Sequence, residues 1–184
     1  TEAGLDAPDV GQYSNLMVDS SGTIYLAYYD RANGDLKVAR GGFGAWTTVA
    51  TYGAGENTGA WPTLSEGGGG IWLAFQNLDA HTLWWGNLAG GTVVASAIDE
   101  GTFTGADSTI AWVDGTAVIM YQDAQSNDVK MARRDAQGVV TLSTYMADGA
   151  LGFHNNVAVD STGRLNFACF DHTRTNFVFQ RFAL

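Results

Sequence analysis

The length, composition and charge of this chain limit what it can be. Its 184 residues are close to one domain's length, and the 46% that are hydrophobic are ample for a core. The formal net charge is −10, and the nine lysines and arginines form no cluster, which argues against binding nucleic acid or an anionic membrane through a basic patch. No segment approaches the roughly 18 consecutive apolar residues of a membrane span, so we expect no membrane insertion.

Residues 11–40 (GQYSNLMVDSSGTIYLAYYDRANGDLKVAR) predict three antiparallel strands. Short apolar or alternating runs rich in Tyr, Val, Ile and Leu are separated by SSG and RANG, which are typical of tight hairpin turns. Residues 45–52 (AWTTVATY) supply a fourth strand.

The same unit recurs three more times along the chain. Its opening glycines, Gly11, Gly59, Gly105 and Gly152, are spaced 48, 46 and 47 residues apart, and its second strand reads IYLAYYD, IWLAFQN, AVIMYQD and LNFACFD in successive copies. A period of about 40 to 50 residues with four strands per unit is typical of a β-propeller, in which each unit is one blade. Helical periodicity is absent, so we expect an all-β protein.

The predicted blades span residues 11–56, 57–101, 102–149 and 150–184, and residues 1–10 are expected to end an outermost strand and lead into the first blade. The last blade has a third strand but no fourth. Two architectures fit this pattern. In one, residues 1–5 complete the fourth blade and close a four-bladed ring. In the other, the chain is part of a larger ring of seven or eight blades, and a cleaved partner chain or a second copy supplies the rest, with Thr1 marking a processing point.

Two of the turns between first and second strands share the pattern Val-Asp-Ser-x-Gly. With the unit SNLMVDSSGTIYLAYYDRANGDLKVAR, they resemble the blades of secreted bacterial β-propellers of the broad sialidase-like (BNR, Asp-box) class. The strict box reads Ser-x-Asp-x-Gly, whereas Asp19 and Gly22 are three residues apart here, as are Asp160 and Gly163. In such boxes the Asp and Gly hold a hairpin, so the resemblance implies a fold and not a catalytic role. Together with the acidic, lysine-poor composition, it indicates a secreted or cell-surface protein.

One column of the repeat points to a ligand site. Propellers bind ligands around a central channel, on the face formed by the loops that enter each innermost strand. Two positions after the opening glycines stand Tyr13, Trp61, Asp107 and His154. Flat rings with polar neighbours suit stacking on a sugar. The candidate ligand-binding residues are therefore Gln12, Tyr13, Trp61, Asp107, His154 and Asn155. The alternative is that the rings wedge between adjacent blades.

A second column, Asp30, Asn77, Asp123 and Asp171, closes the second strands. Asp and Asn at the start of a turn commonly accept hydrogen bonds from their own backbone two residues on, and this is the role we expect. A cation site that pairs Asp30 with Asp35, or Asp123 with Asp128, is the alternative, since hard cations need several converging oxygens.

Cys169, the one cysteine, replaces an aromatic residue in mid-strand and is expected to be a small buried hydrophobe. We assign no catalytic residue and expect no cofactor or metal.

Two functional hypotheses remain. The first is a non-catalytic binding or interaction propeller that recognises a glycan or a protein partner through its loop face, because the acidic residues are scattered and tryptophans gather in the second blade. The alternative is a fragment of a sialidase-like glycoside hydrolase whose catalytic residues lie partly on blades that this chain lacks.

Overall fold

A computed structural model describes residues 9–42, 45–53 and 55–184, and in them the chain forms β-strands and turns with no helix. Blade 1 comprises β1 (Val10–Val18), β2 (Ile24–Asp30), β3 (Asp35–Gly42) and β4 (Ala45–Tyr52). Blade 2 comprises β5 (Thr58–Gly67), β6 (Gly70–Asn77), β7 (Thr82–Ala89) and β8 (Thr92–Asp99). Blade 3 comprises β9 (Thr104–Val113), β10 (Thr116–Asp123), β11 (Asp128–Arg134) and β12 (Val140–Met146), and blade 4 comprises β13 (Phe153–Val159), β14 (Leu165–Asp171) and β15 (Asn176–Phe182).

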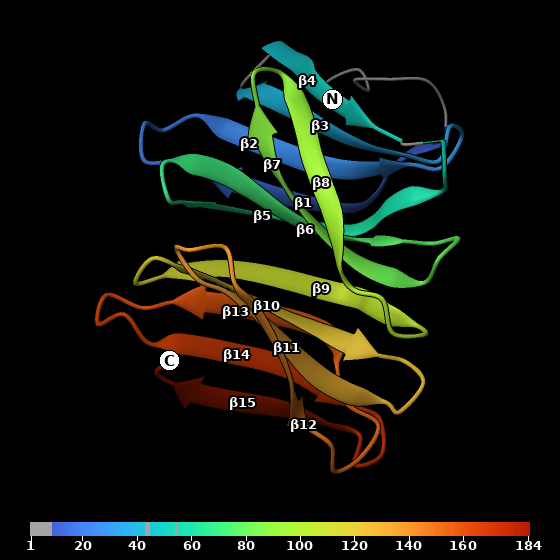
Figure 1. Cartoon of the computed structure of the whole chain (residues 1–184), viewed down its shortest axis with the longest axis vertical. Helices are drawn as coiled ribbons and strands as arrows, with labels where there is room; N and C mark the ends of the chain where they lie inside the picture. The colour runs from blue at the N-terminus through green and yellow to red at the C-terminus, as the bar shows by residue number, and fades with distance from the viewer. Residues whose placement is uncertain (1–8, 43–44, 54) are drawn as a thin grey trace.

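Each blade is one antiparallel sheet whose strands are hydrogen-bonded in chain order, as Figure 1 shows. Such meanders form because tight turns join successive strands, so that each strand pairs with the next one along the chain. The predicted all-β, four-bladed propeller arrangement is confirmed. Of the segment 1–10, which we expected to end an outermost strand, residues 1–8 lie outside the described residues and Val10 begins the innermost strand β1.

Three buried apolar clusters fill the boundaries between successive blades. At the first boundary Leu36 and Val38 of β3 meet Phe75 of β6, and at the third Met120 of β10 meets Phe167 of β14. The second boundary buries Leu83, Trp85, Ile119 and Tyr121. Each sheet is therefore apolar on the faces that a neighbouring blade covers, which is why no blade is expected to be stable alone.

The opening glycines allow the blades to approach one another closely. A Cβ placed on Gly59 would lie 2.5 Å from the Cβ of Leu36, and one on Gly105 would lie 2.8 Å from the Cα of Leu83. Directly beside these glycines, the backbone N–H of Thr58 donates to the carbonyl of Gly34, and that of Thr104 donates to the carbonyl of His81. The same arrangement joins Leu151 to Asn127 at the third boundary.

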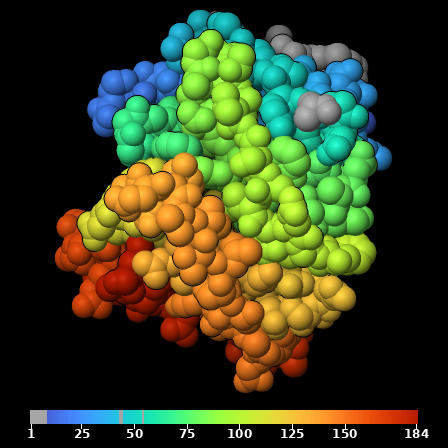
Figure 2. All heavy atoms as spheres, viewed as in Figure 1, coloured from blue at the N-terminus to red at the C-terminus, as the bar shows by residue number. Residues whose placement is uncertain are grey.

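The blades form a row that is open at both ends in the part of the chain that the structure describes. Blade 1 lies at one end of the molecule and blade 4 at the other, and blue and red atoms lie at opposite ends of the face that the space-filling view shows (Figures 1 and 2). Within the described ranges, none of the three buried clusters joins blade 4 to blade 1. Closure of a four-bladed ring by residues 1–5 falls outside the described residues.

Candidate functional site

A cavity of about 470 Å³ is bordered by the innermost strand of every blade. Because β1, β5, β9 and β13 pack side by side in that order, the space that they share lies along the axis of the propeller. Its lining residues are Tyr13, Ser14, Asn15, Trp61, Pro62, Thr63, Asp107, Ser108, His154 and Asn155.

An irregularity near the start of each innermost strand places these side chains. In β1 the pairing with β2 shifts register on both sides of Gln12, and in β5 the pairing with β6 shifts on both sides of Ala60. The opening glycines have φ between +85° and +105°, and the residues two positions later are also left-handed, with φ of 54°, 47°, 47° and 55° for Tyr13, Trp61, Asp107 and His154. A side chain in that conformation costs about 1–2 kcal/mol, and such strain is concentrated at functional sites.

The structure brings five of the six candidate residues together. Tyr13, Trp61, Asp107, His154 and Asn155 all line the axial cavity. Gln12 precedes them in β1 and is not among the lining residues. The assignment of ligand contact to these residues stays a prediction.

Tyr13 and Trp61 form a tilted ring pair across the first blade boundary, with ring centroids 4.5 Å apart. The wedge between blades that we weighed as an alternative is therefore part of the geometry. The contact between the blades does not bury both rings, because Tyr13 keeps 44% of its surface exposed. The pair therefore offers an apolar face at the cavity wall.

Sequence reasoning missed the polar residues that follow in these strands, although they also form a column. Four positions after the opening glycine, Asn15 Oδ1 accepts a hydrogen bond of 3.1 Å from the Leu64 N–H, and Thr109 Oγ1 accepts one of 3.2 Å from the Val157 N–H. Both bonds cross a blade boundary. The signal that was available is the run of Asn15, Thr63, Thr109 and Asn156 in one column of the repeat.

Two polar side chains at the cavity wall have no partner among the residues that the structure describes. In these residues neither Asn155 Oδ1 nor Asn155 Nδ2 makes a hydrogen bond, and nor does Thr63 Oγ1, although all three atoms are buried. Leaving such a group unsatisfied costs about 1–3 kcal/mol. Each unpaired group deserves an explanation, and a bound polar molecule or water in the cavity would provide one.

The ionisable groups among the ten lining residues are few. Asp107 contributes the one carboxylate, His154 the one imidazole and Tyr13 the one phenol. The carboxylate belongs to blade 3 and the imidazole to blade 4, whereas the tilted ring pair, which includes the phenol, comes from blades 1 and 2.

The aspartates that close the second strands hold turns, as predicted. The Asp79 N–H donates to Asn77 Oδ1 at 3.0 Å, and the Thr173 N–H donates to Asp171 Oδ1 at 2.8 Å. Asp30 is fully buried and forms an ion pair of 2.9 Å with Lys37. Throughout residues 9–42, 45–53 and 55–184, no group of three or more His, Cys, Asp or Glu side chains is arranged to hold a metal ion.

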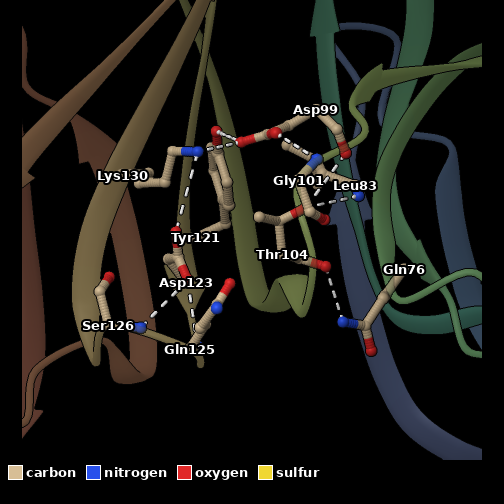
Figure 3. Close-up of polar contacts among 10 residues, drawn as sticks. All are labelled: Gln76, Leu83, Asp99, Gly101, Thr104, Tyr121, Asp123, Gln125, Ser126 and Lys130. Atoms are coloured by element: carbon tan, nitrogen blue, oxygen red, sulfur yellow. Dashed lines mark hydrogen bonds and ion pairs between the residues drawn. The ribbon is translucent and has the colours of Figure 1, made fainter.

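A buried polar network lies between blades 2 and 3 (Figure 3), and its residues differ from those that line the axial cavity. Asp99 accepts hydrogen bonds from the Tyr121 hydroxyl at 2.6 Å, from Lys130 Nζ at 2.5 Å and from the Gly101 N–H at 2.9 Å. Burial and the bond to Asp99 raise the pKa of Tyr121 well above its ordinary value. Burial acts to raise the pKa of Asp99, but the bonds from Lys130 and Tyr121 outweigh it, so that pKa lies below 3.8.

Cys169 lies in the apolar cluster between blades 3 and 4 and is only 3% exposed. Burial raises the pKa of its thiol, which keeps the residue protonated and unreactive.

Along the described ranges, no helix has the length and apolar character that crossing a membrane requires.

Solved structures share this arrangement of blades. The chain matches an α-L-arabinanase of Penicillium chrysogenum complexed with arabinobiose, with a TM-score of 0.63 and 12% identity, over 96% of this chain and 62% of that one. It also matches a GH93 α-L-arabinofuranosidase of Fusarium graminearum, with a TM-score of 0.61 and 12% identity, over 95% and 61% of the two chains. A third match is a family 117 glycoside hydrolase of the marine bacterium Zobellia galactanivorans, with a TM-score of 0.56 and 13% identity, over 100% and 74%.

The chain is a β-propeller by fold. No protein-family model matches its sequence, and no curated protein does. It spans less than two thirds of the arabinanase and of the arabinofuranosidase, so both of those proteins contain a substantial part that has no counterpart here.

These matches correct the first functional hypothesis. We expected a non-catalytic binding propeller, but the propellers named above are enzymes that act on carbohydrates. The alternative, a portion of a glycoside hydrolase, agrees better with them. The expectation rested on the scattered acidic residues of the sequence, and Asp107 is the one carboxylate among the ten residues that line the cavity.

Proposed function

We propose that this chain supplies four blades of a propeller glycoside hydrolase and that its axial cavity holds the glycan. The observation that carries the proposal is the convergence of a ring pair, a carboxylate and unpartnered amide and hydroxyl groups on one cavity at the centre of the fold. Active sites of this kind combine an apolar wall with a few placed polar groups.

Each wall of the cavity has a distinct role in this proposal. Tyr13 and Trp61 stack against the apolar face of a sugar ring. The Asn155 amide and the Thr63 hydroxyl, which have no partner among the described residues, exchange hydrogen bonds with sugar hydroxyls. Asp107 takes part in cleavage, as nucleophile or as general acid or base.

Glycoside hydrolysis ordinarily requires two carboxyl groups, about 5 to 10 Å apart, on either side of the bond that is cleaved. Asp107 is the one carboxylate among the lining residues. In this proposal the second comes from the surface that completes the cavity where the row of blades is open. The incomplete coverage of the arabinanase and the arabinofuranosidase supports that assignment.

The proposed substrate class is neutral glycans that contain arabinose. Support comes from the names of the matched enzymes and from the net charge of −10, which disfavours anionic glycans. A secreted or surface location belongs to the same proposal, since polymeric glycans lie outside the cell. So does the finer sialidase-like resemblance, which is supported by Asp19 and Asp160, whose carboxylates accept bonds from the backbone of their own turns.

The test is hydrolysis of arabino-oligosaccharides and of a chromogenic α-L-arabinofuranoside by the protein in its assembled state. We expect Asp107→Asn to lower kcat about 100-fold or more while oligosaccharide binding is kept. Asp114→Asn is the matched control, because Asp114 lies in the same blade, has a similar left-handed φ of 49° and is exposed in a turn outside the cavity. Equal loss in both variants, or no turnover of any glycoside by the wild-type protein, would contradict the proposal.

A further inference from the structure

The repeat makes the two ends of the row directly comparable with the boundaries inside it. Five positions after the opening glycine, Leu64, Ile110 and Val157 are 7%, 5% and 8% exposed, because each packs against the preceding blade. The equivalent residue of blade 1, Leu16, is 58% exposed. This apolar position is therefore buried in blades 2, 3 and 4 and exposed in blade 1.

At the other end of the row, blade 4 likewise exposes apolar residues whose equivalents in the other blades are buried. In the third strands of blades 1 to 3, Leu36, Leu83 and Val129 are fully buried against the following blade. The equivalent residue of blade 4, Phe177, is 69% exposed, and Phe179 beside it is 53% exposed. These two phenylalanines also border a depression of about 500 Å³ along β15, whose other walls include Met146 and Leu151 at the boundary between blades 3 and 4.

The two end blades also carry the donor and the acceptor of the hydrogen bond that joins successive blades. Inside the row, the residue before an opening glycine donates its N–H to a turn carbonyl of the preceding blade, as in Thr58 to Gly34. The equivalent donor of blade 1 is the Val10 N–H, and the equivalent acceptor of blade 4 is the Thr175 carbonyl. Among the described residues, these two groups make no such bond.

The glycine next to that donor follows the same pattern. Gly59 and Gly105 fit tightly over Leu36 and Leu83 of the preceding blade, whereas a Cβ on Gly11 would meet none of the described residues within 4 Å. Gly11 nevertheless keeps the left-handed φ of +92° that the close approach requires. Blade 1 is therefore shaped for a neighbour that these residues do not provide.

We propose that the blade 4 face of one copy packs on the blade 1 face of a second copy of this chain. The blade 4 face presents Phe177, Phe179 and the Thr175 carbonyl, and the blade 1 face presents Leu16, Gly11 and the Val10 N–H. They are the two halves of one interface that the chain already makes three times internally. A second copy is the occupant because every copy carries both halves.

Such a contact is head-to-tail, so it either closes into a ring or continues into an open filament. Two copies that use both faces form a closed ring of eight sheets. This arrangement also supplies the missing wall of the axial cavity, because β1 and β13 border both the cavity and the open side of the row. The docking surface itself rests on the exposed residues and is independent of the proposed hydrolase activity.

The test is the solution mass of the protein by sedimentation and light scattering over a range of concentrations. We expect the mass to rise from 19.5 kDa to about twice that value. Leu16→Lys and Phe177→Lys should each raise the dissociation constant about tenfold or more, as removal of a central apolar contact does. Val94→Lys is the matched control, because Val94 is 61% exposed on β8, the outer strand of blade 2, and is not part of either face.

Mixing the two variants separates a lost interface from misfolding. The Leu16→Lys copy keeps an intact blade 4 face and the Phe177→Lys copy keeps an intact blade 1 face, so an equimolar mixture should form a two-copy complex that neither variant forms alone. A wild-type protein that stays at 19.5 kDa at all concentrations overturns the proposal and leaves these faces to additional blades on a longer polypeptide. Failure of the mixture to associate overturns the head-to-tail pairing, and masses that grow beyond two copies overturn the eight-bladed ring.

Discussion

The Tyr121 hydroxyl of blade 3 donates a hydrogen bond of 2.6 Å to the Asp99 carboxylate at the end of blade 2. Both side chains are buried, and Lys130 reaches the same carboxylate from β11. The bond therefore joins two blades through a carboxylate whose side chain is only 6% exposed.

Asp99→Asn should destabilise the fold by about 3 kcal/mol, because it leaves Lys130 without its closest counter-charge and weakens the bond from Tyr121. The measurement is denaturant unfolding at neutral pH. Asp114→Asn, at an exposed turn, serves as the control and should change the free energy of unfolding by less than about 0.5 kcal/mol. Equal effects of the two substitutions would show that the network contributes little.

The same carboxylate predicts a pH dependence. The pKa of Asp99 is lower in the folded protein than its ordinary value of 3.8, so between these two values the unfolded chain binds more protons. The stabilisation from Asp99 is therefore complete above pH 3.8 and is lost as pH falls through the folded pKa. Unfolding curves of wild-type protein and Asp99→Asn should converge as the pH is lowered below about 4. Curves that stay parallel there would contradict the prediction.

The left-handed conformation of Trp61 predicts an unusual ranking of substitutions. With φ of 47°, this position favours glycine over alanine, so Trp61→Gly should be more stable than Trp61→Ala by about 1 kcal/mol. At Trp84, in the middle of β7 and without a left-handed φ, alanine should be the more stable of the two. Thermal unfolding of the four variants tests the ranking, and the same order at both positions would refute it.

Two equivalent glycines should respond differently to alanine. Both Gly11→Ala and Gly59→Ala place a side chain at positive φ, but only at Gly59 does the new Cβ overlap Leu36. Gly59→Ala should therefore cost about 1–3 kcal/mol more than Gly11→Ala, as overpacking does. Denaturant unfolding at a concentration where the protein is monomeric gives the difference. Equal costs would mean that the first boundary adjusts to the extra atom.

The ring pair predicts a loss of sugar affinity that leaves the fold intact. Trp61→Ala should weaken arabino-oligosaccharide binding about tenfold, because it removes one stacking face from the cavity wall. Calorimetric titration measures this effect, with Trp46→Ala on the outer strand β4 as a control outside the cavity. Unchanged affinity in Trp61→Ala would exclude the ring pair from ligand contact.

The sequence by itself determined the four sheets, their order and the column that faces the axis. Turn residues and alternating apolar positions act over a few neighbouring residues, and the repeat then carries each local rule to all four blades. The spacing of the repeat therefore groups Tyr13, Trp61, Asp107 and His154 as one set, and all four line the axial cavity.

Only the tertiary structure decided which of these equivalent positions are covered and which polar groups find partners. Leu16 and Leu64 occupy the same column, yet one is exposed and the other buried, because burial depends on the blade that packs against each and not on the residue itself. The pairing of Asp99 with Tyr121 and the unpartnered amide of Asn155 have the same origin. They arise from distances across blade boundaries between residues far apart in the chain, and no local pattern encodes those distances.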